Sequence, residues 1–127
     1  MDGDISLIKL RDPIPLGDKF QAVNLVTEGT SMRENEDLVV AGWGKTENGL
    51  PDNLLKTTVE FQSYSGCERI YNSKQNLFIK GSMLCAGGTG RDSCNGDSGG
   101  PLVRKQADPK DDVLVGLVSW GPANCGR

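Results

Sequence analysis

Five short stretches of the sequence alternate apolar and polar residues and are rich in β-branched side chains. They are DISLIKL (4–10), DLVVAGW (37–43), LKTTVEF (55–61), PLVRK (101–105) and VLVGLVSW (113–120). Successive side chains of a strand point to opposite faces, so a period of two predicts half-buried β-strands. Segments rich in Gly, Pro, Asn and Asp separate these stretches, and we expect one of them, QADPKDD (106–112), to close a hairpin. The pattern favours an all-β fold, an antiparallel sandwich or barrel.

One segment, SYSGCERIYNSK (63–74), has helical signals. A serine is available as N-cap, and Cys67, Ile70 and Tyr71 can share one helical face. No repeat or heptad competes with this reading. At 127 residues the chain is long enough for one domain or for part of a larger one.

The charge pattern argues against two classes of partner. The chain carries 14 Lys and Arg against 17 Asp and Glu, and the basic residues are scattered. A nucleic acid or an anionic membrane is therefore disfavoured as a partner. No stretch approaches the length of a transmembrane helix, and the N-terminus does not resemble a signal peptide, so we expect that a signal was removed or that Met1 is not the natural start.

The four cysteines point to a secreted protein. They form no C-x-x-C pair, and the sequence has no histidine to complete a mixed zinc site. Disulfides are therefore favoured over zinc, and we expect no metal or other cofactor and an extracellular location.

The stretch RDSCNGDSGGPLV (91–103) combines a serine with closely spaced glycines. A serine nucleophile needs a base, and the oxyanion that it creates needs donors already aimed at it. A tight glycine turn can aim successive N–H groups into one small space, and Gly96 and Ser98 are the candidates. Alone, DSGG more often marks an ordinary glycine-rich turn that exposes a serine.

Five motifs, in order along the chain, resemble those of trypsin-like serine endopeptidases of the chymotrypsin fold. They are DISLIKL, VVAGWG, MLCAGG, GDSGGPLV and LVSWG. The resemblance implies an incomplete chymotrypsin-like β-barrel, mostly the second barrel, with one short helix. It also implies a secreted zymogen whose partners are protein or peptide substrates and protein protease inhibitors.

The resemblance assigns roles to individual residues. Ser98 matches the nucleophile and Asp4 the triad aspartate, while the N–H groups of Gly96 and Ser98 match the oxyanion hole. Asp97 matches the acid that pairs with the new α-amino group after zymogen cleavage. The residues expected to bind substrate are Asp92, Ser93, Ser119, Trp120 and Gly121.

Asp92 matches the acid at the base of the primary specificity pocket. Since only a cationic partner compensates a buried carboxylate, this implies cleavage after Arg or Lys. The resemblance also pairs Cys67 with Cys85 and Cys94 with Cys125.

The absence of histidine is the main departure from the family, whose general base is a histidine. Family members carry it in a first barrel upstream of the triad aspartate, and they continue past the position of Arg127 into a final strand and helix. We therefore expect residues 1–127 to form the C-terminal half of a protease domain that is inactive and poorly stable by itself. The alternative is a non-catalytic homologue or fragment that binds partners through the same cleft.

Two further departures bear on the subfamily. A disulfide that many members form between the positions of Leu38 and Arg104 is missing, and Asn24 occupies the place of a cysteine that links the domain to upstream chain. Asn24 is compatible with a natural loss or an engineered replacement. Together with VVAGWGKTENG and GPANCG, the missing bridge is similar to arthropod clip-domain proteases.

Overall fold

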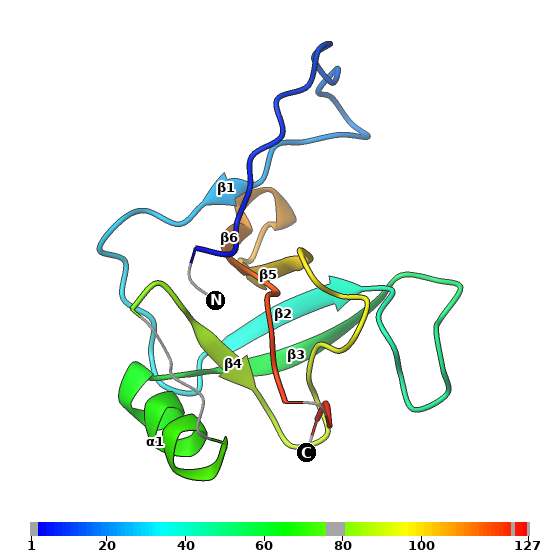
Figure 1. Ribbon diagram of the computed structural model, residues 1–127. Helices are drawn as coiled ribbons and strands as arrows, with labels where there is room; N and C mark the ends of the chain where they lie inside the picture. Colours follow the sequence, from blue (N-terminus) through cyan, green and yellow to red (C-terminus); the bar gives the residue numbers. More distant parts are fainter. Residues whose placement is uncertain (1–2, 76–80, 123, 127) are drawn as a thin grey trace.

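A single open sheet organises the fold. The computed structural model describes residues 3–75, 81–122 and 124–126. These residues form six strands in the order β1-β6-β5-β2-β3-β4 (Figure 1). The strands are β1 (Asn24–Leu25), β2 (Asp37–Gly42), β3 (Leu55–Gln62), β4 (Cys85–Gly87), β5 (Pro101–Arg104) and β6 (Val113–Leu117). Neighbours are antiparallel except β1 and β6, which are parallel, and the all-β prediction is confirmed.

The core lies on one face of strands β2, β3 and β5. Alternate residues of β2, Leu38 and Val40, are buried, while Asp37 is exposed, as the period of two predicts. Leu38 pairs with Val59 across the β2–β3 ladder, and Leu102 of β5 completes the buried cluster. Strands β2, β3 and β5 therefore carry the core, and the site loops extend from their ends.

Four of the five predicted strands are confirmed, within a few residues of their expected ends. The fifth, residues 4–10, is wrong: the segment is extended, but it pairs with no strand among the described residues. Leu7 and Ile8 are 97% and 85% exposed. Alternation gives a segment a potential apolar face, but a strand forms only where a neighbouring backbone supplies hydrogen bonds.

The hairpin loop and the helix predicted from the sequence are both present in the structure. Residues 106–112 close the antiparallel β5–β6 hairpin with a 3-10 turn at Pro109–Asp111, whose N-cap is Asp108. The helix α1 spans Tyr64–Gln75, close to the predicted 63–74, and its first turn is capped where Gly66 N donates to Ser63 Oγ at 3.3 Å. On the predicted helical face Cys67 is buried and Tyr71 half-buried, while the side chain of Ile70 lies outside the described part.

No helix in residues 3–75, 81–122 and 124–126 has both the length and the apolar character needed to cross a bilayer.

Candidate active site

Ser98 lies on an exposed turn that leads into β5. The turn is fixed from inside, since Asp97 N donates to Cys94 O at 2.9 Å and Gly100 N to Asp97 O at 2.8 Å. Gly99 N donates to Val118 O at 2.8 Å, which ties the turn to the segment that follows β6. The serine hydroxyl is therefore presented to solvent from a fixed backbone.

The N–H groups of Gly96 and Ser98 donate to no acceptor within the described residues. Gly96 has φ 102°, in the region that favours glycine, and a Cβ there would lie 3.2 Å from the Cα of Gly44. The backbone conformation thus favours glycine at position 96, and the close approach to Gly44 leaves little room for a side chain. Two unengaged donors beside a hydroxyl can stabilise a developing oxyanion.

Asp4 is hydrogen-bonded to Ser119, in the segment that follows β6. Ser119 Oγ donates to Asp4 Oδ2 at 2.5 Å, although the two residues are 115 positions apart in the chain. Asp4 is exposed, and no hydrogen bond joins it to Ser98. The structure therefore places one carboxylate against the wall that carries Ser119 and Trp120, without direct contact to the candidate nucleophile.

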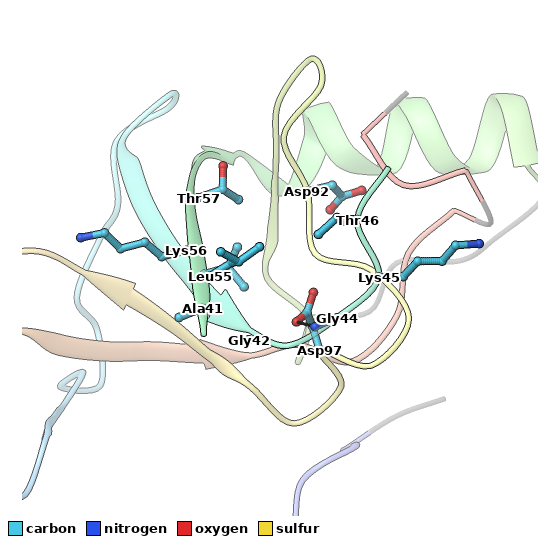
Figure 2. Close-up of a pocket in the computed structure, with 11 residues that line it drawn as sticks. Ala41, Gly42, Gly44, Lys45, Thr46, Leu55, Lys56, Thr57, Asp92 and Asp97 are labelled. Carbon is cyan, nitrogen blue, oxygen red and sulfur yellow. Dashed lines mark hydrogen bonds between the residues drawn. The ribbon is translucent and has the colours of Figure 1, made fainter. Parts of the chain in front are cut away.

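The carboxylate of Asp97 turns away from solvent into the end of β2. Its Oδ1 accepts from Gly44 N at 2.8 Å and its Oδ2 accepts from Cys94 N at 2.9 Å. A Cβ at Gly42 or Gly44 would overlap its oxygens, so glycine makes room for the carboxylate (Figure 2). Gly42 and Gly44 were not predicted as site residues, because nothing in the sequence connects them to Asp97.

A small cavity, about 160 Å³ in volume, opens between the end of β2, the start of β3 and the loop 44–46 (Figure 2). Asp92 and Asp97 both line it. Lys45 and Lys56 line it as well, so two acidic and two basic residues share the cavity and its lining carries no net charge.

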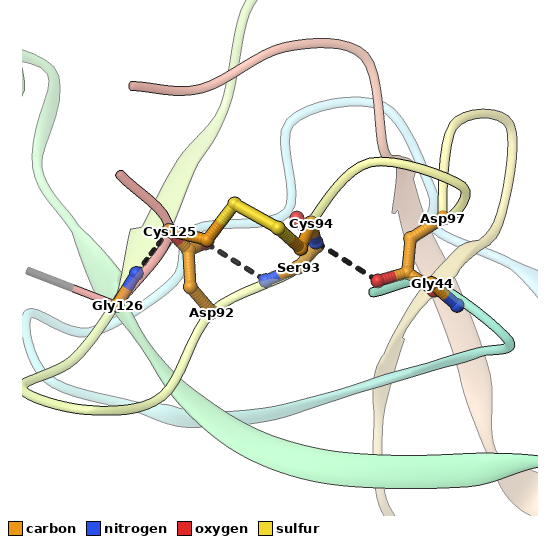
Figure 3. Close-up of a disulfide and its surroundings, with 7 residues drawn as sticks. All are labelled: Gly44, Asp92, Ser93, Cys94, Asp97, Cys125 and Gly126. Carbon is orange, nitrogen blue, oxygen red and sulfur yellow. Dashed lines mark hydrogen bonds between the residues drawn. A yellow bond between two sulfur atoms is a disulfide. The ribbon is translucent and has the colours of Figure 1, made fainter. Parts of the chain in front are cut away.

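Asp92 is half-buried and hydrogen-bonded on both oxygens. Oδ1 accepts from Ser93 N at 2.8 Å and Oδ2 accepts from Gly126 N at 3.1 Å (Figure 3). The Cys94–Cys125 disulfide and the bond from Gly90 N to Gly126 O, 2.8 Å, join the same two loops. The second disulfide, Cys67–Cys85, joins α1 to β4, so the structure contains both pairs that the resemblance implies.

Trp120 packs against the helix. Its ring meets that of Tyr71 edge to face, with centroids 5.3 Å apart and planes at 79°. Burial raises the pKa of the Tyr71 hydroxyl, and the negative charge of Asp92 raises it further. Asp92 thus acts electrostatically on Tyr71, which the sequence indicated only as a member of one helical face. Gly121 follows Trp120 on an exposed part of the chain.

Within the described part of the chain, no group of three or more His, Cys, Asp or Glu side chains is arranged to hold a metal ion.

Comparison with known proteins places this site in a family. The family model described as Trypsin matches residues 1–127. Trypsin epsilon of Drosophila erecta is 39% identical over 132 residues, which cover 99% of this chain and 46% of the relative. Trypsin-1 of Astacus astacus is 39% identical over 131 residues, covering 100% and 52%, and kallikrein-8 of Mus musculus is 37% identical over 128 residues, covering 98% and 45%.

The chain thus spans about half the length of the curated relatives it matches. The family match covers the motifs, the strands and both disulfides described above. The chain belongs to the trypsin family of serine proteases.

Proposed function

We propose that this chain is part of the catalytic domain of a secreted serine endopeptidase. The observation that carries the proposal is the hydrogen bond from Ser119 to Asp4, because it brings a carboxylate from the start of the chain to the cleft wall beside Trp120. The exposed hydroxyl of Ser98 and the unengaged N–H groups of Gly96 and Ser98 supply the other parts of an acyl-transfer site.

In the proposed reaction Ser98 Oγ attacks the scissile carbonyl carbon of a protein substrate. A histidine from outside this chain accepts the hydroxyl proton and returns it to the leaving amine, and Asp4 orients that histidine. The N–H groups of Gly96 and Ser98 bind the oxyanion, and water then hydrolyses the acyl-enzyme. Trp120 and Gly121 pair with the substrate as an added strand.

We assign to Asp92 the selection of Arg or Lys before the scissile bond, with Ser93 beside it in the same pocket. Support comes from its half-buried position and from the fixed orientation of its carboxylate by Ser93 N and Gly126 N. A charge-assisted contact is worth about 1.5–3 kcal/mol, so Asp92→Ser should weaken binding of the cation benzamidine by roughly 10- to 100-fold.

The matched control is Asp111→Ser, which removes an exposed acid on the β5–β6 loop. It should leave the dissociation constant of benzamidine unchanged. Equal affinities in the Asp92→Ser and Asp111→Ser variants, measured by calorimetry, would rule out the assigned specificity.

Asp97 is proposed to report zymogen activation by pairing with a newly formed α-amino group. The support is its position on the same cavity as Asp92, where Gly44 N donates to one of its carboxylate oxygens and Cys94 N to the other. A protonated amine in this cavity would meet Asp92 and Asp97, together with the basic residues Lys45 and Lys56 of the same lining.

The chain by itself is proposed to be inactive, because it has no histidine. Loss of the base from a triad enzyme lowers its rate by about a millionfold. Burst titration with an active-site acylating reagent tests this, and stoichiometric labelling of Ser98 would contradict it.

The missing histidine also favours a second candidate, a non-catalytic homologue that binds partners through the cleft. Sequencing the transcript upstream of Met1 discriminates between the two. A histidine in an AAHC-like segment supports the endopeptidase, whereas another residue at that position supports the binding protein.

A further inference from the structure

We propose that Asn95 is a site of spontaneous chemical modification, at which its side-chain amide is converted to aspartate or isoaspartate next to the candidate oxyanion hole. The chain contains Asn followed by Gly twice, at Asn48–Gly49 and at Asn95–Gly96. Asparagine is chemically labile, most of all before glycine, where no side chain hinders the following nitrogen. The two sites differ in the surroundings of that nitrogen.

At Asn95 the reacting groups are free. Asn95 and Gly96 are exposed, and the N–H of Gly96 donates to no acceptor in the described part of the chain. Lys45 N donates to Asn95 O at 2.9 Å, on the same peptide unit. A donor on this carbonyl withdraws electron density from the unit and so favours ionisation of the Gly96 N–H.

At Asn48 the corresponding nitrogen is engaged. Gly49 N donates to Thr46 O at 3.1 Å, while Thr46 N and Thr46 Oγ1 each donate to Gly49 O at 2.8 Å. Asn48 N donates to Thr46 Oγ1 at 3.1 Å as well. The turn must open before Gly49 N can reach the side chain of Asn48.

The reaction consumes one water and releases one ammonia. After a solvent base removes the Gly96 amide proton, the nitrogen attacks Asn95 Cγ and a bond forms between N and Cγ. The protonated base returns the proton to Nδ2 as the Cγ–Nδ2 bond breaks, and ammonia leaves. Water then opens the cyclic imide. Cleavage of the bond from N to Cγ leaves aspartate, and cleavage of the bond from N to the former main-chain carbonyl leaves isoaspartate.

The modification itself does not depend on the proposed function, but its consequence does. Isoaspartate inserts an extra carbon into the backbone immediately before Gly96, and either product adds a negative charge there. If Gly96 N–H binds the oxyanion as proposed, both changes weaken that site.

The test uses the purified chain of residues 1–127 with both disulfides intact, kept at neutral pH in water enriched in oxygen-18. Peptide mapping by mass spectrometry follows both Asn-Gly sites in the same molecules. Because opening the Gly49 hydrogen bond costs about as much as a typical net hydrogen bond, Asn95 should convert about three- to tenfold faster than Asn48. In the reduced chain in urea the two rates should converge.

Asn95→Gln is the control, because glutamine would have to close a larger ring and reacts more slowly. It should abolish conversion at position 95 and leave the rate at Asn48 unchanged. Conversion of Asn48 at the same rate as Asn95 in the folded chain, or a ratio that persists after unfolding, would overturn the proposal. A changed rate at Asn48 in the Asn95→Gln variant would also overturn it. The ratio of the conversion rates at Asn95 and Asn48 would then reflect packing between the two loops and not the hydrogen bonding of each glycine nitrogen. Both sites are followed by peptide mass and not by activity. A negative result would therefore leave the labelling test of Ser98 unaffected.

Discussion

Single contacts around Asp97 explain why two glycines stand at the end of β2. Gly44 donates its N–H to the Asp97 carboxylate and leaves no atom where a Cβ would overlap it. Gly44→Ala should therefore displace the carboxylate and lower the free energy of unfolding by about 1–3 kcal/mol. Urea denaturation measures this loss as a shift of the unfolding midpoint.

Gly17→Ala is the matched control, because a Cβ at Gly17 meets nothing within 4 Å and its φ is not positive. It should change the free energy of unfolding by less than about 0.5 kcal/mol. If both variants unfolded at the same urea concentration, the close approach of Gly44 to Asp97 would contribute nothing to the free energy of unfolding.

The motif around Ser98 indicates from sequence alone the candidate nucleophile, the candidate oxyanion donors and the acids Asp92 and Asp97. The contacts that hold them were not predictable. Gly44 reaches Asp97 across 53 positions, and Tyr71 reaches Trp120 across a distance in sequence that no local pattern encodes. Such contacts depend on the folded arrangement of loops, which periodicity does not describe.

An ion pair connects β5 to the residue that precedes β2. Arg104 Nε lies 2.6 Å from Glu36 Oε1, and each side chain is 19% exposed. Arg33 N also donates to Glu36 Oε2 at 2.9 Å. This hydrogen bond, and then the charge of Arg104, hold the pKa of Glu36 below its ordinary value.

A carboxyl whose pKa is lower in the folded state stabilises the fold at pH values above its unfolded pKa, and this stabilisation is lost as the pH falls through the folded value. Glu36→Gln should therefore lower the free energy of unfolding at neutral pH by up to about 1 kcal/mol. The difference from the unsubstituted chain should disappear in acid. Urea denaturation across this pH range checks the trend, with the exposed Glu28→Gln as control.

A difference that grows as the pH falls would have the wrong sign for a carboxylate stabilised in the fold.

The ion pair lies beside the positions where many family members form a disulfide, Leu38 and Arg104. Here Leu38 is buried in the core and Arg104 pairs with Glu36.

The strands show where sequence patterns suffice. Strands β2, β3, β5 and β6 were predicted because apolar and polar residues alternate in each segment and β-branched residues are frequent; β2, β3 and β5 each bury at least one side chain, whereas those of β6 are half-buried or exposed. Strands β1 and β4 have two and three residues, too few to show a period. Residues 4–10 alternate apolar and polar residues but have no neighbouring strand in the described part of the chain. The prediction failed there because strand pairing needs two segments, and the pattern of one segment does not show whether a second lies beside it.

Among the described residues of the molecule, few apolar side chains are buried and many large ones are exposed. Only four apolar side chains form the buried core cluster in the described part: Leu38, Val40, Val59 and Leu102. The segment before β1 instead exposes a series of large apolar side chains: Ile5, Leu7, Ile8, Leu10, Ile14, Leu16 and Phe20. Exposed apolar surface of this kind promotes association.

We therefore expect the purified chain to bind the dye ANS and to associate as its concentration rises. Leu7→Lys combined with Ile8→Lys should reduce both signals, because these side chains are the most exposed of the series. Leu50→Lys, which changes a 75% exposed residue in a separate loop, is the control. Analytical ultracentrifugation and dye fluorescence would refute this expectation if the double variant behaved like the Leu50 control.

The most direct measurement is labelling of Ser98 by a fluorophosphonate with and without added imidazole. If the chain holds the nucleophile, the oxyanion donors and the orienting acid but no base, labelling should be negligible without imidazole and should rise with its concentration. The rise should vanish in Ser98→Ala and weaken in Asp4→Asn, because an amide orients the ring in the wrong tautomer. Stoichiometric labelling without imidazole, or an imidazole-dependent rise that survives Ser98→Ala, would contradict the assignment.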